Sequence, residues 1–244
     1  MRKTTFHICL SILLALINIS ILYAQQTENV WNFPIRPGTE EWGQLDSYEA
    51  KLDAYNIPPD ILNSISTKAL TESCLSYPEW RLIFTRNSYC AGLAYVGSIF
   101  NGFGELLDRT EAADILLAKY KSTDPTNIDK NWSPAERGRY TFNITYIELL
   151  LSHNQFIKNL SRDQEIELIT LAVEKYHSKK SLPENYSLYG TSPTALICAR
   201  IIDKNGFIKD LDSEKFNFFT HTGMINDSDF LDQIVDQAEK FLNN

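Results

Sequence analysis

The sequence predicts an all-α protein, either a single-domain helical bundle or an irregular stack of antiparallel helical hairpins. Apolar residues recur every three or four positions from about residue 40 almost to the end of the chain. Helix-capping sequences stand in front of several of these apolar stripes. Strand signals are almost absent, and the connections are short, which favours antiparallel neighbours.

Residues 1–24 have the pattern of a secretory signal peptide. Arg2 and Lys3 precede a nearly continuous apolar run over 8–23, and Ala24 precedes a polar stretch. We therefore expect cleavage after Ala24 and a protein exported to the periplasm or the cell exterior. Leu22 stands where a small residue is preferred, which leaves an uncleaved N-terminal anchor as the alternative.

The charge of the chain argues against nucleic acid as a partner. The formal net charge is −8, and removal of a leader with two basic residues and no acidic one would bring it to −10. An acidic chain without a basic stripe repels phosphate backbones and anionic membranes. The apolar stretch 89–103 is too short and too rich in glycine for a transmembrane segment, so we expect none in the mature chain.

Residues 25–38 are predicted to be an extended lead-in, and residues 39–244 a single all-helical domain. Pro34 and Pro37 disfavour helix, and Gly38 ends the segment. Trp31 and Phe33 indicate that the lead-in packs on the domain. Helical faces then follow over 42–55, 61–65, 66–77 and 80–84.

The second half carries clearer helix signals. Ser133 with Glu136, and Ser161 with Gln164, form capping boxes that open two helices. The first of these is apolar on most sides, with Phe142 counted in its buried face, and should lie near the centre. Further helices are predicted to start near 110, at Pro193 and near 228, whereas 216–222 is interpreted as a loop.

The segment 86–109 is the main candidate binding surface. It combines aromatic and polar residues with four glycines, Gly92, Gly97, Gly102 and Gly104, each of which weakens a helix by about 1 kcal/mol relative to alanine. An aromatic-lined groove with a polar end is one interpretation, and a tightly packed central helix followed by a turn is the other. The candidate binding residues here are Arg86, Tyr89, Tyr95, Asn101 and Arg109. Arg137 and Arg139, in the first turns of the helix after Ser133, form a second candidate surface or ordinary surface charge.

No motif indicates catalysis, a metal or a cofactor, and we predict no catalytic residue, no metal ligand and no cofactor. His153 and His177 stand at the C-terminal ends of predicted helices, where the helix dipole favours a cation. The acidic stretch 226–229 resembles part of a calcium loop, but it is better explained as a helix N-cap.

Three cysteines would survive removal of the leader: Cys74, Cys90 and Cys198. A disulfide between Cys74 and Cys90 would close a loop of roughly 15 residues and stabilise the protein by about 3 kcal/mol. The alternative is three buried thiols, because free cysteine is among the most buried residue types.

The N-terminal part of the chain resembles a protein family. Phe33–Trp42, Ile57–Leu62, Ser66–Leu70 and Cys74–Pro78 follow in an order similar to that of uncharacterised secreted proteins from Gram-negative gut-type bacteria. The resemblance covers about residues 31–80. It implies export and a helical fold, and it implies no activity and no catalytic residue.

The leading functional hypothesis is an exported, non-catalytic binding or structural module. Its partner would be a protein, a small molecule or a glycan. The alternative is an extracellular or periplasmic hydrolase that acts on glycan or peptide through carboxylates that sequence cannot pair. A helical scaffold for a cell-surface assembly is a third hypothesis, and it would expose a large apolar patch.

Overall fold

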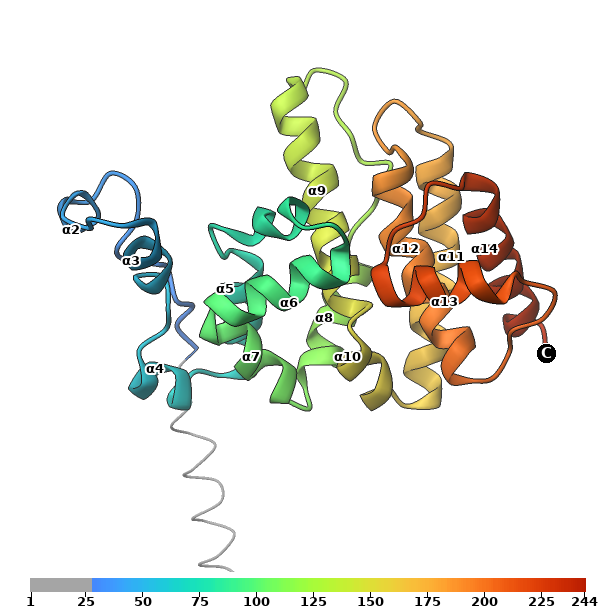
Figure 1. Ribbon diagram of the computed structural model, residues 1–244, viewed down its shortest axis with the longest axis horizontal. Coiled ribbons are helices and arrows are strands. Elements are labelled where there is room, and N and C mark those ends of the chain that lie inside the picture. The colour runs from blue at the N-terminus through green and yellow to red at the C-terminus, as the bar shows by residue number, and fades with distance from the viewer. Residues whose placement is uncertain (1–27) are drawn as a thin grey trace, which may run out of the picture.

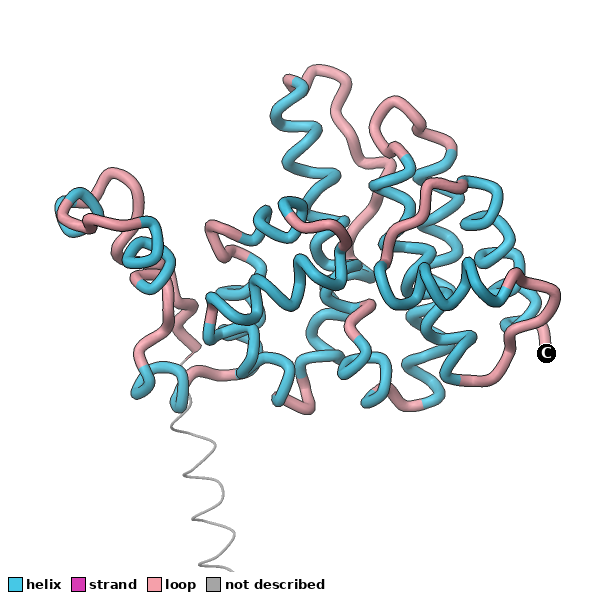
Figure 2. The backbone as a smooth tube through the Cα atoms, viewed as in Figure 1, coloured by secondary structure: helices cyan, strands magenta, loops and turns pink. Residues whose placement is uncertain are grey.

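The computed structural model describes residues 28–244, and within this range it contains helices and loops but no strand (Figures 1 and 2). The all-α fold class is therefore confirmed. The predicted signal peptide lies outside the described residues.

The N-terminal part begins with an extended segment and short helices. Residues 28–38 contain no helix, and Phe33 is buried against the rings of Tyr55, Tyr77 and Phe100, so the lead-in packs on the protein as expected. Gly38 ends the segment with a φ of +98°, a conformation that favours glycine. The helices that follow are α2 (Glu40–Gly43), α3 (Tyr48–Asp53), α4 (Pro59–Ser64) and α5 (Thr67–Leu75).

The glycine-rich segment forms two helices separated by a break. A 3-10 helix, η1 (Trp80–Thr85), leads into α6 (Tyr89–Ile99), and the chain turns at Phe100 into α7 (Asn101–Asp108). A Cβ on Gly92 would lie 2.1 Å from the carbonyl oxygen of Ile83, so only glycine lets η1 pack this closely on α6. The close approach and the break that the glycines suggested are both present.

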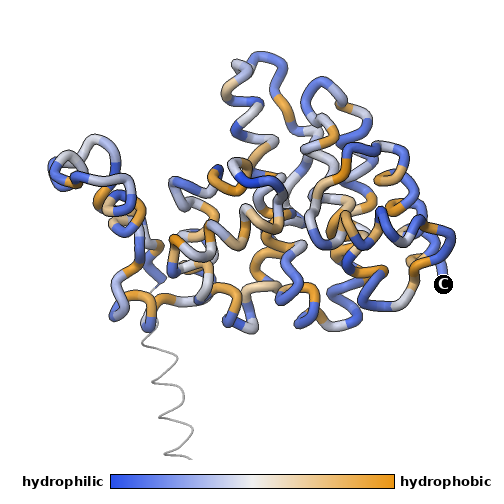
Figure 3. The backbone as a smooth tube through the Cα atoms, viewed as in Figure 1, coloured by the Kyte–Doolittle hydropathy of each residue, from blue (hydrophilic) through white to orange (hydrophobic). Residues whose placement is uncertain are grey.

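The second half supplies the long helices. They are α8 (Ala112–Lys121), α9 (Pro134–Leu151), α11 (Arg162–Lys180), α12 (Leu188–Lys204) and α14 (Ser228–Leu242), with the shorter α10 (Asn154–Asn159) and α13 (Ser213–Thr222) between them. Helix α12 contacts α9, α11, α13 and α14 and forms the centre of this half (Figure 1). Apolar residues concentrate where these helices face one another, and the core extends from Phe33 to Phe241 (Figure 3).

The cap predictions are confirmed by hydrogen bonds. Both capping boxes form, with Ser133 and Glu136 opening α9 and with Ser161 and Gln164 opening α11. Asp227 caps α14 by accepting a hydrogen bond from the N–H of Phe230, as expected for the acidic stretch 226–229.

Three element predictions are wrong. The helical face predicted over 42–55 is divided between α2 and α3, because residues 44–47 are not helical. Residues 216–222 are not a loop but most of α13, which Asp212 caps and which buries Phe216 and Phe219 one turn apart. Pro193 does not start a helix; it lies inside α12, more than one turn after Leu188. The hydrogen bond that proline removes is the one to the carbonyl of Tyr189, and this carbonyl accepts from the hydroxyl of Tyr89 instead.

Candidate functional site

A cleft of about 750 Å³ lies between the N-terminal half of α9, the junction of η1 with α6, and the start of α12. Its volume falls in the range of pockets that hold small organic ligands. Aromatic rings and one thioether form much of its lining: Phe84, Tyr89, Phe142, Tyr186, Tyr189 and Met224.

Two of these aromatic side chains are unusually exposed. Phe142, on α9, is 45% exposed, and Tyr189, on α12, is 63% exposed. Phe84 supports Phe142 with 5.4 Å between ring centroids. The cleft therefore has accessible rings on two of its walls, and such rings can stack on a ligand with a flat face.

Pro193 has a direct role in joining two walls of the cleft. Because proline has no N–H, it leaves the carbonyl of Tyr189, four residues earlier, without its intrahelical donor. The hydroxyl of Tyr89, at the start of α6, donates a hydrogen bond of 2.9 Å to this carbonyl. The helix irregularity thus holds the start of α12 against α6.

The charged part of the lining is mainly cationic. Arg86, the residue after η1, and Arg137, in the first turn of α9, both line the cleft, and Glu184 is its one carboxylate. The guanidinium of Arg86 lies 3.5 Å from the ring centroid of Tyr95, a cation–π contact that fixes its position. The Glu184 carboxylate accepts a hydrogen bond from the side-chain amide of Asn185.

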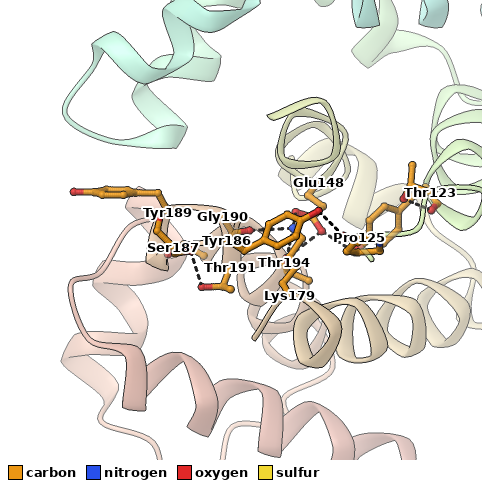
Figure 4. Close-up of polar contacts among 12 residues, drawn as sticks. Thr123, Pro125, Glu148, Lys179, Tyr186, Ser187, Tyr189, Gly190, Thr191 and Thr194 are labelled. Carbon is orange, nitrogen blue, oxygen red and sulfur yellow. Dashed lines mark hydrogen bonds and ion pairs between the residues drawn. The ribbon is translucent and has the colours of Figure 1, made fainter. Parts of the chain in front are cut away.

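A buried ionic network lies behind the start of α12. Lys179 of α11 forms an ion pair with Glu148 of α9, and both side chains are fully buried. The Lys179 ammonium also donates to the carbonyl of Gly190 at 2.9 Å and to the hydroxyl of Thr194 at 3.0 Å (Figure 4). The other Glu148 oxygen accepts from the hydroxyls of Thr194 and Tyr120, both at 3.0 Å.

This network positions the cleft and does not line it. All three Lys179 N–H donors are used, and burial lowers the pKa of Lys179 while Glu148 partly opposes that shift. Gly190 and Tyr186 line the cleft and also contact the ionic network. The carbonyl of Gly190 accepts a hydrogen bond from Lys179, and the Lys179 ammonium lies 5.3 Å from the ring centroid of Tyr186. The network therefore ties α9 and α11 to the start of α12.

The structure brings together three of the seven predicted binding residues. Arg86, Tyr89 and Arg137 share the cleft. Tyr95 and Asn101 line a separate hollow, and the Asn101 side chain is bonded to both backbone groups of Ile57.

The remaining two predicted binding residues lie elsewhere. Arg109 forms an ion pair with Glu105 and donates to the carbonyls of Leu62 and Ile65, which indicates a structural role. Arg139 is exposed and outside the cleft.

Cys74, Cys90 and Cys198 are free thiols, so the Cys74–Cys90 disulfide that the spacing allows is not formed. Cys74 and Cys198 are fully buried, and burial raises the pKa of both thiols well above the usual range. Cys90 is partly exposed, and its Sγ accepts a hydrogen bond of 3.0 Å from Arg200.

Arg200 is a buried arginine whose role is structural. It donates to the carbonyls of Ser152 and Thr220, at the C-terminal ends of α9 and α13, where helix dipoles favour a cation. Burial, together with the charge of Arg200, lowers the pKa of the neighbouring His153. The Nε of Arg200 has no hydrogen-bond partner.

Sequence reasoning missed most of the aromatic lining. Phe142 was predicted to be buried but lies at the surface, because no neighbouring helix covers the face of α9 that carries it. Tyr186 and Tyr189 were not among the predicted binding residues, because they stand beside a turn and outside any helical apolar face. The sequence signal available was the density of tyrosine around residues 186–189.

Comparison of the chain with protein families, with curated proteins and with solved structures finds no match. In residues 28–244, no helix is long and apolar enough to cross a membrane. That same part of the chain holds no cluster of three or more metal-ligating side chains.

Proposed function

We propose that the protein is a non-catalytic binding protein that holds a small organic ligand in the cleft between α9, α6 and α12. The observation that carries the proposal is the exposure of Phe142 and Tyr189 on two walls of one cleft. Burying such rings against a ligand would remove apolar surface from water, which favours binding.

The cleft is lined by too few carboxylates for glycoside hydrolysis, which favours a binding function. Most glycoside hydrolases use two carboxyl groups about 5 to 10 Å apart. Glu184 is the one carboxylate among the residues that line the cleft, and Glu148 behind it is fully buried in an ion pair. Neither arrangement supplies an acid and a base that face the same ligand.

We also propose that the protein works in the periplasm or at the cell exterior. The basic start, apolar run and Ala24 of residues 1–24 support this location.

Replacing both Phe142 and Tyr189 by alanine is expected to weaken ligand binding at least about tenfold, because the ligand would lose both stacking surfaces. Binding is measured by isothermal titration calorimetry with a panel of neutral and acidic oligosaccharides and short peptides. The thermal midpoint should change little, since both side chains are largely exposed.

The matched control is Phe218→Ala, which removes a 55% exposed aromatic ring from α13 outside the cleft and should leave binding unchanged. Unchanged binding by the Phe142→Ala/Tyr189→Ala protein would contradict the proposal. Appearance of new reducing ends or peptide termini on incubation with the panel would favour the hydrolase instead.

A further inference from the structure

A second feature of the cleft, resting on the proposed function, is its unpaired positive charge. Arg86 and Arg137 both face it, and neither forms an ion pair with any residue from 28 to 244. The chain as a whole carries a formal net charge of −8. The guanidinium of Arg86 is stacked on Tyr95, so Arg137 is the cation left to attract an anionic ligand into this cleft of an acidic protein.

The start of α12 adds backbone donors to the same cleft. Ser187 occupies the N-cap position, yet its side chain makes no capping hydrogen bond, in contrast to Ser133 and Ser161. The N–H of Gly190 donates to the carbonyl of Ser187, whereas the N–H groups of Leu188 and Tyr189, the first two of this 17-residue helix, have no acceptor within residues 28–244. Ser187, Tyr189 and Gly190 all line the cleft, so the positive end of the helix dipole adjoins it.

A threonine hydroxyl of the cleft is also left without a protein partner among residues 28–244. Thr145 is only 3% exposed and lines the cleft one turn before Glu148. Its hydroxyl makes no hydrogen bond within the part of the chain that the structure describes. This hydroxyl is not among the fully buried atoms that lack a partner, so it can bond with water or with a polar ligand in the cleft.

These groups distinguish between the ligand classes that an aromatic cleft can hold. The free groups of the cleft are guanidinium, hydroxyl and helix N–H groups, which match carboxylate or sulfate oxygens and sugar hydroxyls. Exposed rings match the flat faces of sugar units. We infer that the ligand is an oligosaccharide with carboxylate or sulfate groups, and that Arg137 and the start of α12 bind its anionic group.

The test compares four probes by isothermal titration calorimetry: tetragalacturonate, a sulfated chondroitin tetrasaccharide, neutral cellotetraose and tetraglutamate. One of the acidic saccharides should bind at least about tenfold more tightly than cellotetraose. Its Kd should rise with salt, because the attraction between charges is screened.

Variants of Arg137 locate the anionic contact. Arg137→Gln should weaken binding of the acidic saccharide about tenfold and leave cellotetraose unaffected, and Arg137→Lys should restore part of the loss, because lysine keeps the charge but not the planar fork. Arg139→Gln, two residues along the same helix and outside the cleft, is the control and should bind as the unmodified protein does.

The outcomes separate this inference from the proposed function. Equal affinity for cellotetraose and the acidic saccharides, unchanged in Arg137→Gln, would overturn the anionic ligand and leave the binding function standing. Binding of tetraglutamate alone would overturn the saccharide class. Saccharide binding that survives the Phe142→Ala/Tyr189→Ala change would place the ligand outside the cleft and overturn both.

Discussion

Replacement of Lys179 by methionine is expected to lower the free energy of unfolding by about 3–5 kcal/mol. The change removes the cation that compensates Glu148, and both side chains are fully buried. The carboxylate would keep the hydroxyl donors of Tyr120 and Thr194 but lose its counter-charge in a dry environment. Urea unfolding followed by far-UV circular dichroism measures the loss.

Two further variants show whether the uncompensated charge is the cause. Lys180, the next residue of α11, forms an exposed ion pair with Asp232 of α14. Lys180→Met breaks this pair and should lower the free energy of unfolding by less than about 1 kcal/mol. Lys179→Met combined with Glu148→Gln should be more stable than Lys179→Met alone, because the glutamine is neutral and can still accept from Tyr120 and Thr194. A double variant less stable than Lys179→Met would contradict the explanation.

Gly92→Ala is expected to destabilise the protein by about 1–3 kcal/mol or more. The added Cβ would lie 2.1 Å from the carbonyl oxygen and 2.7 Å from the carbonyl carbon of Ile83, both backbone atoms that cannot rotate away. Helix η1 must therefore move from α6, and Phe84 and Arg86 would move with one wall of the cleft. We expect a lower urea midpoint together with weaker ligand binding.

Gly104→Ala is the matched control for this prediction. Gly104 lies inside α7, and nothing stands within 4 Å of its added Cβ. Alanine should there stabilise the protein by about 0.5–1 kcal/mol through helix propensity. If Gly92→Ala were as stable as Gly104→Ala, the close contact between η1 and α6 would not be what requires glycine at position 92.

The helical fold could be predicted from the sequence because its signals are local. Capping boxes act within four residues, so Ser133 and Ser161 mark helix starts whatever surrounds them. The break at Phe100 and the close approach at Gly92 follow from glycine in the same way. Residues 216–222 were misinterpreted because aromatic and β-branched residues are typical of strands, and the cap at Asp212 lies before that window.

The candidate site could be predicted only in part, because it depends on contacts between distant segments. Arg86 and Arg137 stood out as charged residues beside aromatic ones, but no local pattern shows that they face one cleft. Helical periodicity placed Phe142 in the core, because periodicity identifies an apolar face but not whether another helix covers it. The pairing of Lys179 with Glu148 joins residues 31 apart and has no sequence signal.

The most direct test of the cleft as the ligand site is to fill it. Gly138 lines the cleft within α9, and a Cβ added there would have no atom within 4 Å, so tryptophan can be introduced without a clash at its base. We expect Gly138→Trp to abolish calorimetric binding of the acidic tetrasaccharide at an unchanged or higher thermal midpoint, while Gly138→Ala binds normally. Full-affinity binding by a folded Gly138→Trp protein would contradict the account.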